Sequence, residues 1–299
     1  MSTFILLTIT GFGLGAMYFL IASGLSLIYG LMGVLNFAHG AFISVGSYGT
    51  WWFSAHVFDG IHSILLQWLL SSLVGLGLGA VFAGLVELVL IRPLYTRHME
   101  QVLVTVGLSI AFVALIQGIW GTDPKTFPVP PWLHETTTIA GAHIPNDRWI
   151  EIATAAVVLC LLRLFLRRTR YGLIIRAGVE NRAMVQALGI DVRRAFTVVF
   201  AIGGVAAAVA GVLSGVYFND VSPDQGTNLL IFAFIVVVIG GLGSIGGSAA
   251  AATVVALTQQ YTNYYASSGV GDMVVVLLLG LVLLARPRGL AGAVVGARA

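Results

Sequence analysis

Residues 225–271 read QGTNLLIFAFIVVVIGGLGSIGGSAAAATVVALTQQYTNYYASSGVG, a run of 47 residues without Asp, Glu, Lys or Arg. A helix needs about 20 apolar residues to cross the hydrocarbon core of a membrane, so this run is long enough for two crossings. The glycine cluster at 240–247 interrupts it, and each glycine in a helix interior costs about 1 kcal/mol. We therefore expect a turn or half-helix there. Broken backbone at membrane depth is tolerated only where protein buries it or a wet cavity faces it.

The N-terminal run, residues 1–58, has the same character. It also lacks Asp, Glu, Lys and Arg, and the sequence GLMGVLNFAHG at 30–40 interrupts it. We expect two crossings here, with a broken or half helix near 30–40. One break in each half of the chain hints at an inverted repeat, an arrangement that is common in transporters. The two halves share no residue-by-residue identity, so this hint rests on the breaks alone.

The composition of the whole chain indicates a membrane protein. Of its 299 residues, 58% are hydrophobic and only 9% are charged, and the mean hydropathy is +0.98. A soluble domain carries about a quarter charged residues, so this chain cannot cover a water-facing surface. Cytosolic enzymes, nucleic-acid-binding proteins and disordered proteins are thereby excluded. We predict an all-α polytopic membrane protein of about nine spans, within a range of eight to ten, whose further apolar runs lie at 60–86, 101–122, 149–166, 195–219 and 273–285.

The basic residues predict which loops face the cytoplasm. Thirteen of the fifteen fall within 92–97, 163–194 and 286–298, whereas Lys125 and Arg148 flank the longest polar loop. Cytoplasmic loops carry an excess of Lys and Arg. We therefore expect a single membrane domain over 1–299, with a cytoplasmic loop at 167–195 and an external loop at 121–148. The prolines and tryptophans of the external loop fit an interfacial aromatic belt or, alternatively, a landing surface for a solute-binding protein.

The cytoplasmic loop contains a short predicted helix. Asn181 is a suitable N-cap and Gly189 a suitable residue to end it, which leaves about two turns between them. A helix this short is marginal alone in water, so it needs a surface to pack against. One interpretation is an interfacial helix on anionic lipid, and the other is a docking helix that transmits force from a cytoplasmic protein. The physical chemistry of the loop does not choose between them.

Several residues in the apolar runs are candidates for function. Asn36 and His39 are polar residues in an apolar run. Burying such groups at membrane depth costs free energy unless each has a hydrogen-bond partner. In the structural interpretation, Asn36 caps a helix starting at Phe37 and His39 hydrogen-bonds a freed carbonyl. In the functional one, they line a solute path, since the amides at a half-helix N-terminus attract a carboxylate. Both can hold together.

Glu87 lies five residues before Arg92 and is interpreted either as one partner of a salt bridge or as a proton-coupling carboxylate. The glycine pairs with small-xxx-small spacing favour close helix contacts: Gly11/Gly15, Gly75/Gly79 and Gly211/Gly215.

Sequence motifs for cofactors are weak or absent. The residues 241–246 fit GxGxxG, but no acidic residue follows about 20 positions on, so a dinucleotide site is not expected. The chain has no GxxxxGK[ST] sequence, so any ATP that drives it must be bound by a partner. One cysteine and six unpaired histidines predict neither a disulfide nor a metal site. We expect no cofactor and no catalytic residue.

The sequence resembles a known family at several places. It is similar, from about residue 11 to 290, to the membrane permease subunits of bacterial ABC importers for branched-chain amino acids. The residues that carry the resemblance are Gly13–Gly30, Asn36-Phe37-Ala38-His39-Gly40, Arg92-Pro93-Leu94, Tyr171–Ile190, Ser222-Pro223 and Ala233–Gly247. Within the family the chain looks like the shorter leucine/isoleucine/valine-type subunit that carries Asn-Phe-Ala-His-Gly.

The resemblance implies a function and a set of partners. The chain would be a non-enzymatic, multi-pass subunit in the bacterial inner membrane, moving branched-chain amino acids or a related amino acid, amide or urea. Its partners would be a second permease subunit, sister or copy, two cytoplasmic ATP-binding subunits, a periplasmic solute-binding protein and membrane lipid, and no nucleic acid. The alternative is an ion-coupled secondary carrier that acts alone.

The resemblance also assigns residues. The ATPase-coupling helix would comprise Arg176, Glu180, Asn181, Arg182, Ala187, Leu188 and Gly189. The candidate solute path comprises Asn36, Phe37, His39, Gly40, Gly241, Gly243 and Ser244.

Overall fold

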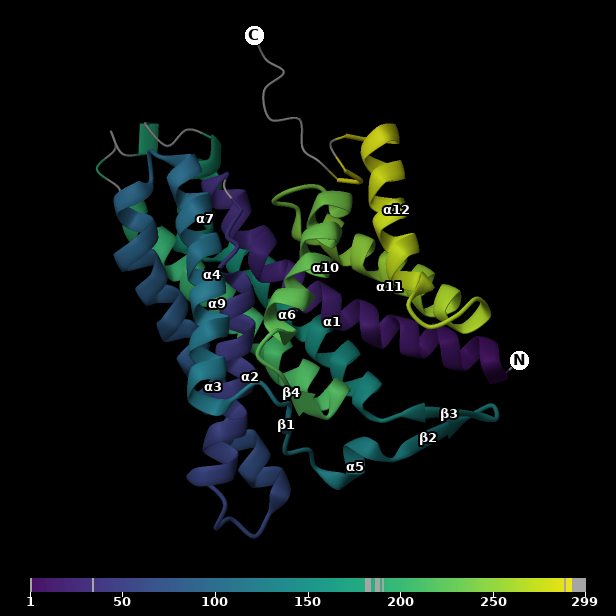
Figure 1. Ribbon diagram of the computed structural model, residues 1–299. Coiled ribbons are helices and arrows are strands. Elements are labelled where there is room, and N and C mark those ends of the chain that lie inside the picture. Colours follow the sequence, from purple (N-terminus) through teal and green to yellow (C-terminus); the bar gives the residue numbers. More distant parts are fainter. Residues whose placement is uncertain are drawn as a thin grey trace.

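The structure is a computed structural model that describes residues 2–33, 35–180, 184–185, 189, 191–287 and 289–291. Its architecture is a helical bundle with two small two-stranded sheets (Figure 1). The long helices are α1 (Ser2–Met32), α2 (His39–His56), α3 (Ile64–Val86), α4 (His98–Trp120), α6 (Asp147–Arg168), α9 (Val192–Phe218), α10 (Gln225–Gly240), α11 (Ile245–Tyr265) and α12 (Val270–Ala285). The shorter ones are α5 (Pro131–His134), α7 (Arg170–Glu180), the π-helix η1 (Glu87–Ile91) and the 3-10 helix η2 (Arg92–Leu94).

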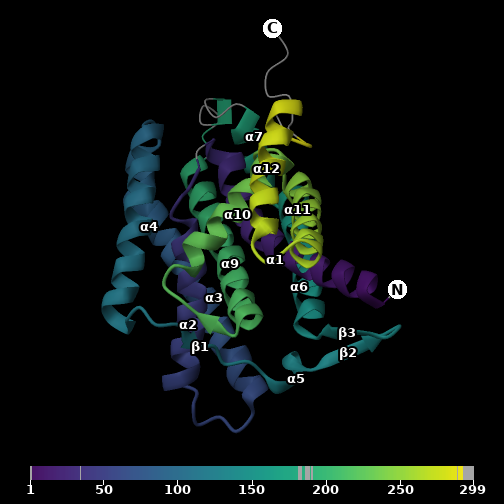
Figure 2. The same cartoon turned by 45° about the vertical axis from the view of Figure 1, so that its right-hand side comes forward.

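Two groups of helices share α9. In the first, α1 crosses the middle of the molecule at a large angle to α2 and α3 and packs against α11, α9, α6 and α10 (Figure 1). In the second, α2, α3 and α9 pack against one another. The helix α4 lies at the edge of the bundle (Figure 2) and contacts the rest of the described chain weakly. Only 11% of its most apolar stretch is buried, against 67% for α9.

The predicted breaks are present in the structure. The helix α1 ends at Met32 and α2 begins at His39, while α10 and α11 meet at an angle of 116° across 241–244. The two breaks also contact each other, because a Cβ built on Gly243 would lie 2.9 Å from the Gly30 Cα. These glycines thus allow the chain to turn at each break and allow the two breaks to approach each other closely.

The predicted number of spans, eight to ten, is higher than the structure supports by length and composition. Among the described residues, five helices qualify, or up to six if the bent pair α10–α11 counts as one span. Each run predicted to cross does form a helix. However, α12 has 16 residues and rises only about 24 Å, short of the hydrocarbon thickness of about 30 Å.

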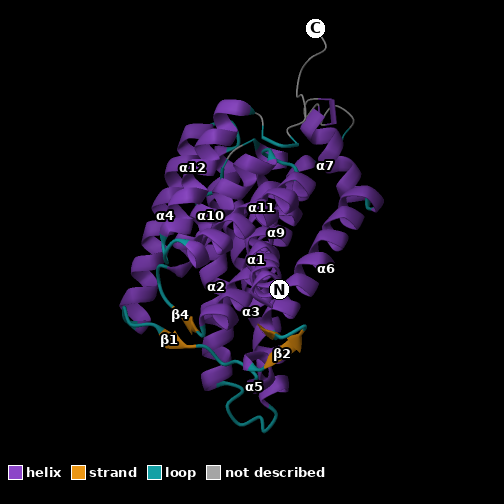
Figure 3. Ribbon diagram, turned by 90° about the vertical axis from the view of Figure 1, so that its right-hand side faces the viewer, coloured by secondary structure: helices purple, strands orange, loops and turns teal. Residues whose placement is uncertain are grey.

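The predicted external loop contains secondary structure that its sequence does not indicate. β1 (Lys125–Thr126) pairs antiparallel with β4 (Asp220–Val221), and β2 (Thr136–Ile139) pairs with β3 (Ala142–Pro145). Figure 3 shows these strands at one end of the bundle, called here the strand end, and α7 at the other, called the α7 end. The predicted external and cytoplasmic loops therefore lie at opposite ends of the molecule.

The glycine pairs predicted from their spacing lie in close helix contacts, except that Gly215 faces the ring of Phe127 in a loop. Gly75 faces the carbonyl of Gly46 on α2, and Gly79 faces Ala208 and the Gly204 carbonyl on α9. A Cβ at Gly79 would lie 2.6 Å from the Ala208 Cβ, closer than real Cβ contacts allow. The pairs Gly11/Gly15 and Gly211/Gly215 are similarly crowded.

We predict that Gly79→Ala lowers the free energy of unfolding in detergent by about 1–3 kcal/mol, because overpacking forces α3 away from α9. The matched control is Gly77→Ala on the same helix, where no atom lies within 4 Å of the added Cβ. That control should be neutral or stabilising by up to about 1 kcal/mol through helix propensity. Equal effects of the two substitutions on the thermal midpoint would contradict the predicted packing role.

Candidate functional site

Asn36 lies in the segment between α1 and α2 and organises the turn that precedes α2. Its side chain is buried, and its Oδ1 accepts a hydrogen bond of 3.1 Å from the Ala38 N–H. The helix itself begins at His39 with Ala38 as its N-cap, so Asn36 does not cap a helix at Phe37. Its Nδ2 has no hydrogen-bond partner among the described residues.

His39 joins α2 to α1. The ring is fully buried, and its Nε2 lies 3.0 Å from the carbonyl oxygen of Ile21, which requires that Nε2 carry the proton and donate. Gly24 makes room for the ring, since a Cβ there would lie 2.8 Å from the His39 Cε1. The next residue, Gly40, lies against the Gly226 backbone of α10. Both predicted path residues therefore sit in helix contacts in this conformation.

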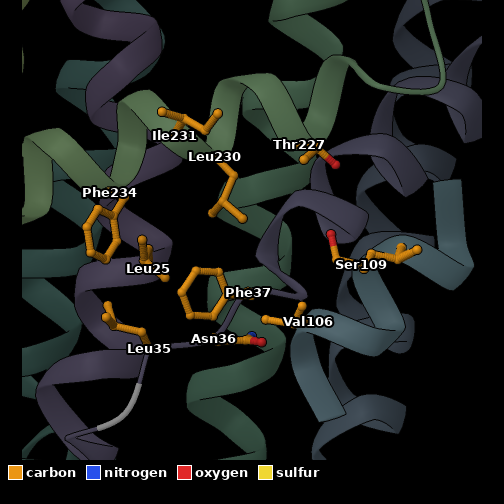
Figure 4. Close-up of a pocket in the computed structure, with 11 residues that line it drawn as sticks. Leu25, Leu35, Asn36, Phe37, Val106, Ser109, Thr227, Leu230, Ile231 and Phe234 are labelled. Atoms are coloured by element: carbon orange, nitrogen blue, oxygen red, sulfur yellow. The ribbon is translucent and has the colours of Figure 1, made fainter. Parts of the chain in front are cut away.

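Asn36 and Phe37 line an apolar cavity of about 280 Å³ between α1, α4 and α10. Figure 4 shows the Phe37 ring in the middle of this cavity, with Leu25, Leu230 and Phe234 on one side and Val106 and Ser109 on the other. The rings of Phe37 and Phe234 stack with centroids 6.4 Å apart. This cavity lies beside α4, which packs weakly against the rest of the described bundle. The outer side of α4 can therefore be covered by lipid or by another chain.

The second break is built from glycines and a serine cap. Gly241 and Gly243 have φ angles of 96° and 81°, which other residues rarely adopt. Ser244 is the N-cap of α11, and its Oγ accepts a hydrogen bond of 3.1 Å from the Gly247 N–H. A segment that follows α12 donates hydrogen bonds to the last carbonyls of α10. The Leu290 N–H donates to the Ile239 carbonyl, and the Ala291 N–H donates to the Gly240 carbonyl.

Gly243 and Arg176 line the same cavity, of about 220 Å³, at the α7 end. Its other lining residues come from α1, α6, α7 and the start of α11: Ser26, Leu27, Gly30, Leu166, Ile175 and Ile245. The structure thus brings one predicted path residue beside one predicted coupling residue. It does not bring Gly243 into the cavity that holds Asn36 and Phe37, so the predicted path residues are divided between two places.

The predicted coupling helix is only partly described. Arg176 and Glu180 belong to α7, a helix that the sequence analysis did not delimit and that ends at Glu180. Asn181, Arg182, Ala187 and Leu188 lie outside the described residues, so the helix between 181 and 189 stays a prediction. Gly189 has a φ of 76°, the left-handed conformation expected of a residue that ends a helix. Val185 is buried in the main hydrophobic core together with Ile175.

Glu87 is the centre of a buried polar cluster near the α7 end. Its carboxylate lies 3.3 Å from the Arg92 Nε and accepts a hydrogen bond of 2.7 Å from the Thr197 hydroxyl of α9. The Tyr95 hydroxyl also donates to it. Glu87 is fully buried, so these partners replace the water it would otherwise bind. The predicted salt bridge between Glu87 and Arg92 is confirmed.

The sequence analysis missed a polar cavity near the strand end. Its volume is about 350 Å³, and amides, carboxylates and tyrosines from five helices and β4 line it, among them Tyr18, Gln225, Gln259 and Asp272. One signal was available, because Gln259 and Asn263 have the i, i+4 spacing that places two polar groups on one face of an apolar helix. The convergence of that face with α1, α10 and α12 had no signal in the sequence.

Comparisons with known proteins give a consistent result. The sequence model of a family described as "Branched-chain amino acid transport system / permease component" matches residues 7–285. The high-affinity branched-chain amino acid transport system permease protein LivH of Salmonella typhimurium is 29% identical over 289 residues, 94% of this chain and 93% of the relative. BraD of Pseudomonas aeruginosa, described in the same terms, is 29% identical with coverages of 95% and 94%. The fructose import permease protein FruF of Bifidobacterium longum is 24% identical, with coverages of 77% and 61%. No solved structure matches the chain.

We predict that Glu87→Ala lowers the free energy of unfolding in detergent by about 2 kcal/mol or more. Hydrogen bonds to charged groups are each worth about 1.5–3 kcal/mol, and this substitution removes the acceptor that Arg92, Tyr95 and Thr197 share. The control is Glu100→Ala, which removes a solvent-exposed ion pair with Arg97 and should change stability by less than about 1 kcal/mol. If both variants melt at the wild-type temperature, Glu87 has no structural role.

Proposed function

Because the chain belongs to the family of permease components of branched-chain amino acid transport systems, we propose that it is the membrane-spanning subunit of an ATP-driven importer in the bacterial inner membrane. It is a multi-pass membrane protein and a transport permease, not an enzyme. The proposed solutes are branched-chain amino acids or a related amino acid, amide or urea. Two relatives are named for branched-chain amino acids and a more distant one for fructose, which supports small polar solutes as the wider class.

The cavity shared by Arg176 and Gly243 carries the mechanistic part of the proposal. α7 leads directly into the predicted coupling helix, and its Arg176 lines a cavity beside the turn between α10 and α11. A push on the cytoplasmic loop 167–195 would therefore act on the glycine hinge that sets the angle between those helices. Hinges of this kind absorb large changes in φ and ψ. ATP would be bound and hydrolysed by two cytoplasmic subunits, since this chain has no GxxxxGK[ST] sequence.

The remaining partners follow from the surfaces of the bundle. The outward faces of α4 and α6 are apolar and mostly unburied, which supports contact with lipid and with a second permease subunit. The loop 121–148 at the strand end would receive the periplasmic solute-binding protein. We place Asn36, Phe37 and Gly243 along the solute path because they line cavities. His39, Gly40, Gly241 and Ser244 would position the backbone that borders the path.

The alternative is an ion-coupled carrier in which Glu87 exchanges a proton. The ion pair with Arg92 and the hydrogen bonds from Tyr95 and Thr197 favour a structural role for Glu87 instead. The two functions separate in liposomes that contain this chain alone. If the chain is an importer subunit, these liposomes should show no uptake. If it is an ion-coupled carrier, they should take up the solute, and an ionophore should abolish that uptake.

We predict that replacing 180–189 by a Gly-Ser linker of equal length abolishes ATP-dependent uptake and the co-purification of the ATP-binding subunits. The physical reason is that the linker cannot form a helix for those subunits to grip. Membrane insertion, checked by the accessibility of loop cysteines, should be unchanged. The matched control replaces the ten residues of the strand-end hairpin, 136–145, and should keep the ATP-binding subunits attached. Normal uptake by the 180–189 variant would refute the coupling role.

A further inference from the structure

The polar cavity near the strand end is lined by two chemically different sets of side chains. In the apolar set, the Tyr18 ring stacks on Phe232 with centroids 5.0 Å apart, together with Leu14, Met17 and Leu229. The polar set consists of amide and carboxylate groups: Asp220, Gln225, Asn228, Gln259, Gln260, Asn263 and Asp272. Its volume, about 350 Å³, is at the small end of the range for ligand pockets. The cavity therefore suits a small solute that is polar at one end and apolar at the other.

A chain of hydrogen bonds fixes the carboxylate of Asp272. The Tyr18 hydroxyl donates to the Gln259 Oε1 at 2.8 Å, and the Gln259 Nε2 donates to the Asp272 Oδ1 at 2.5 Å. The Gln259 amide is thereby held with its N–H toward Asp272. Asp272 is an exposed residue, and only its Oδ1 takes part in this chain. Asp272 also lies in the first turn of α12, where the helix dipole favours a negative charge.

Gln225 contributes a donor that nothing in the described chain uses. The residue is 7% exposed, and its Nε2 has no hydrogen-bond partner among the described residues. Its Oε1 faces the Ser222 N–H at 3.4 Å, so the amide is oriented. A buried donor without a partner is unfavourable. Gln225 also lines the cavity, so a turn of its amide would bring the covered N–H to an acceptor on a ligand.

The charges of the residues that line the cavity determine which kind of solute it favours. Two carboxylates, Asp220 and Asp272, face the cavity, and no Lys, Arg or His is among the described lining residues. The Arg148 guanidinium lies over the ring of Tyr217, a lining residue, at 3.7 Å and is paired with Glu151 and Asp147. The cavity therefore favours a cationic head group over an anionic one.

We propose that this cavity is a solute-binding site for a molecule with an ammonium group and a compact apolar side chain. The ammonium binds the Asp272 carboxylate, an oxygen of the solute accepts from the Gln225 Nε2, and the side chain packs on Phe232 and Leu229. Asp220 of β4 lines the cavity, which places the proposed site near the strand end. This inference rests on the proposed importer function and specifies its chemical selectivity.

The first experiment compares variants of Asp272 in proteoliposomes that contain the complete importer, with radiolabelled L-leucine as the probe. Asp272→Asn should lower ATP-driven uptake about tenfold or more, because it replaces a charge-assisted contact by a neutral one. Asp272→Glu should restore part of the uptake. The control is Asp59→Asn, which removes an exposed carboxylate between α2 and α3, outside the cavity lining, and should transport normally. Wild-type uptake by Asp272→Asn, or failure of that variant to assemble, overturns the proposal.

The second experiment separates binding from stability. Gln225→Met keeps the side-chain length but removes the unpartnered donor together with the Oε1 that faces the Ser222 N–H at 3.4 Å. The loss of that long contact is offset by the removal of a buried donor that had no partner. The thermal midpoint should therefore change little while leucine uptake falls several-fold. If the variant transports leucine like the wild type, the proposed site is wrong.

The wild-type arm tests the importer function itself. If the wild-type complex takes up fructose or urea with ATP but not leucine, the importer function holds and the ammonium site is overturned. If it takes up none of the three with ATP, the proposed function fails, and the site proposed on that basis fails with it.

Discussion

Backbone at membrane depth must find its hydrogen-bond partners within the protein, and this constraint shapes the whole molecule. The chain breaks two helices and places the breaks against each other, with Gly30 and Gly243 in backbone contact. Because neither residue has a Cβ, the end of α1 can approach the turn between α10 and α11 closely. The serine cap on α11 and the segment at 289–291 satisfy groups that the second turn frees.

Several of the polar groups that the chain buries are paired across helices. Glu87 is bound by Arg92, Tyr95 and Thr197, and His39 donates to a carbonyl of α1. Such groups tie η1 to α9 and α1 to α2, whereas other buried polar atoms, such as the hydroxyls of Tyr48 and Ser248, have no hydrogen-bond partner among the described residues. The polar cavity is different, because amides and carboxylates from several helices line an open volume there. That contrast separates groups that hold the bundle together from groups that are available to a solute.

Sequence patterns predicted the helical class, the helical runs and both breaks, because apolar length and glycine clusters are local signals. They also predicted the Glu87–Arg92 pair, whose partners lie five residues apart. They did not predict the pairing of β1 with β4, since Lys125 and Val221 are far apart in the chain and neither strand exceeds two residues. For the same reason the polar cavity was missed: its residues come from five helices and β4 and converge only in the folded chain. The predicted number of spans was too high because the absence of charged residues from a run does not determine the length of its helix. The 16 residues of α12 illustrate this.

The hydrogen bonds from Leu290 and Ala291 to the end of α10 have a consequence for biogenesis. The donors are synthesised 51 residues after the carbonyls they meet, counting from Ile239 to Leu290. When α10 leaves the ribosome, Leu290 and Ala291 have not yet been synthesised. The last carbonyls of α10 therefore enter the translocon without their final hydrogen-bond partners. The turn can reach its native pairing only after α11 and α12 have been inserted. Assembly of this corner of the protein is a late event, and ribosome stalling before residue 290 would leave it open.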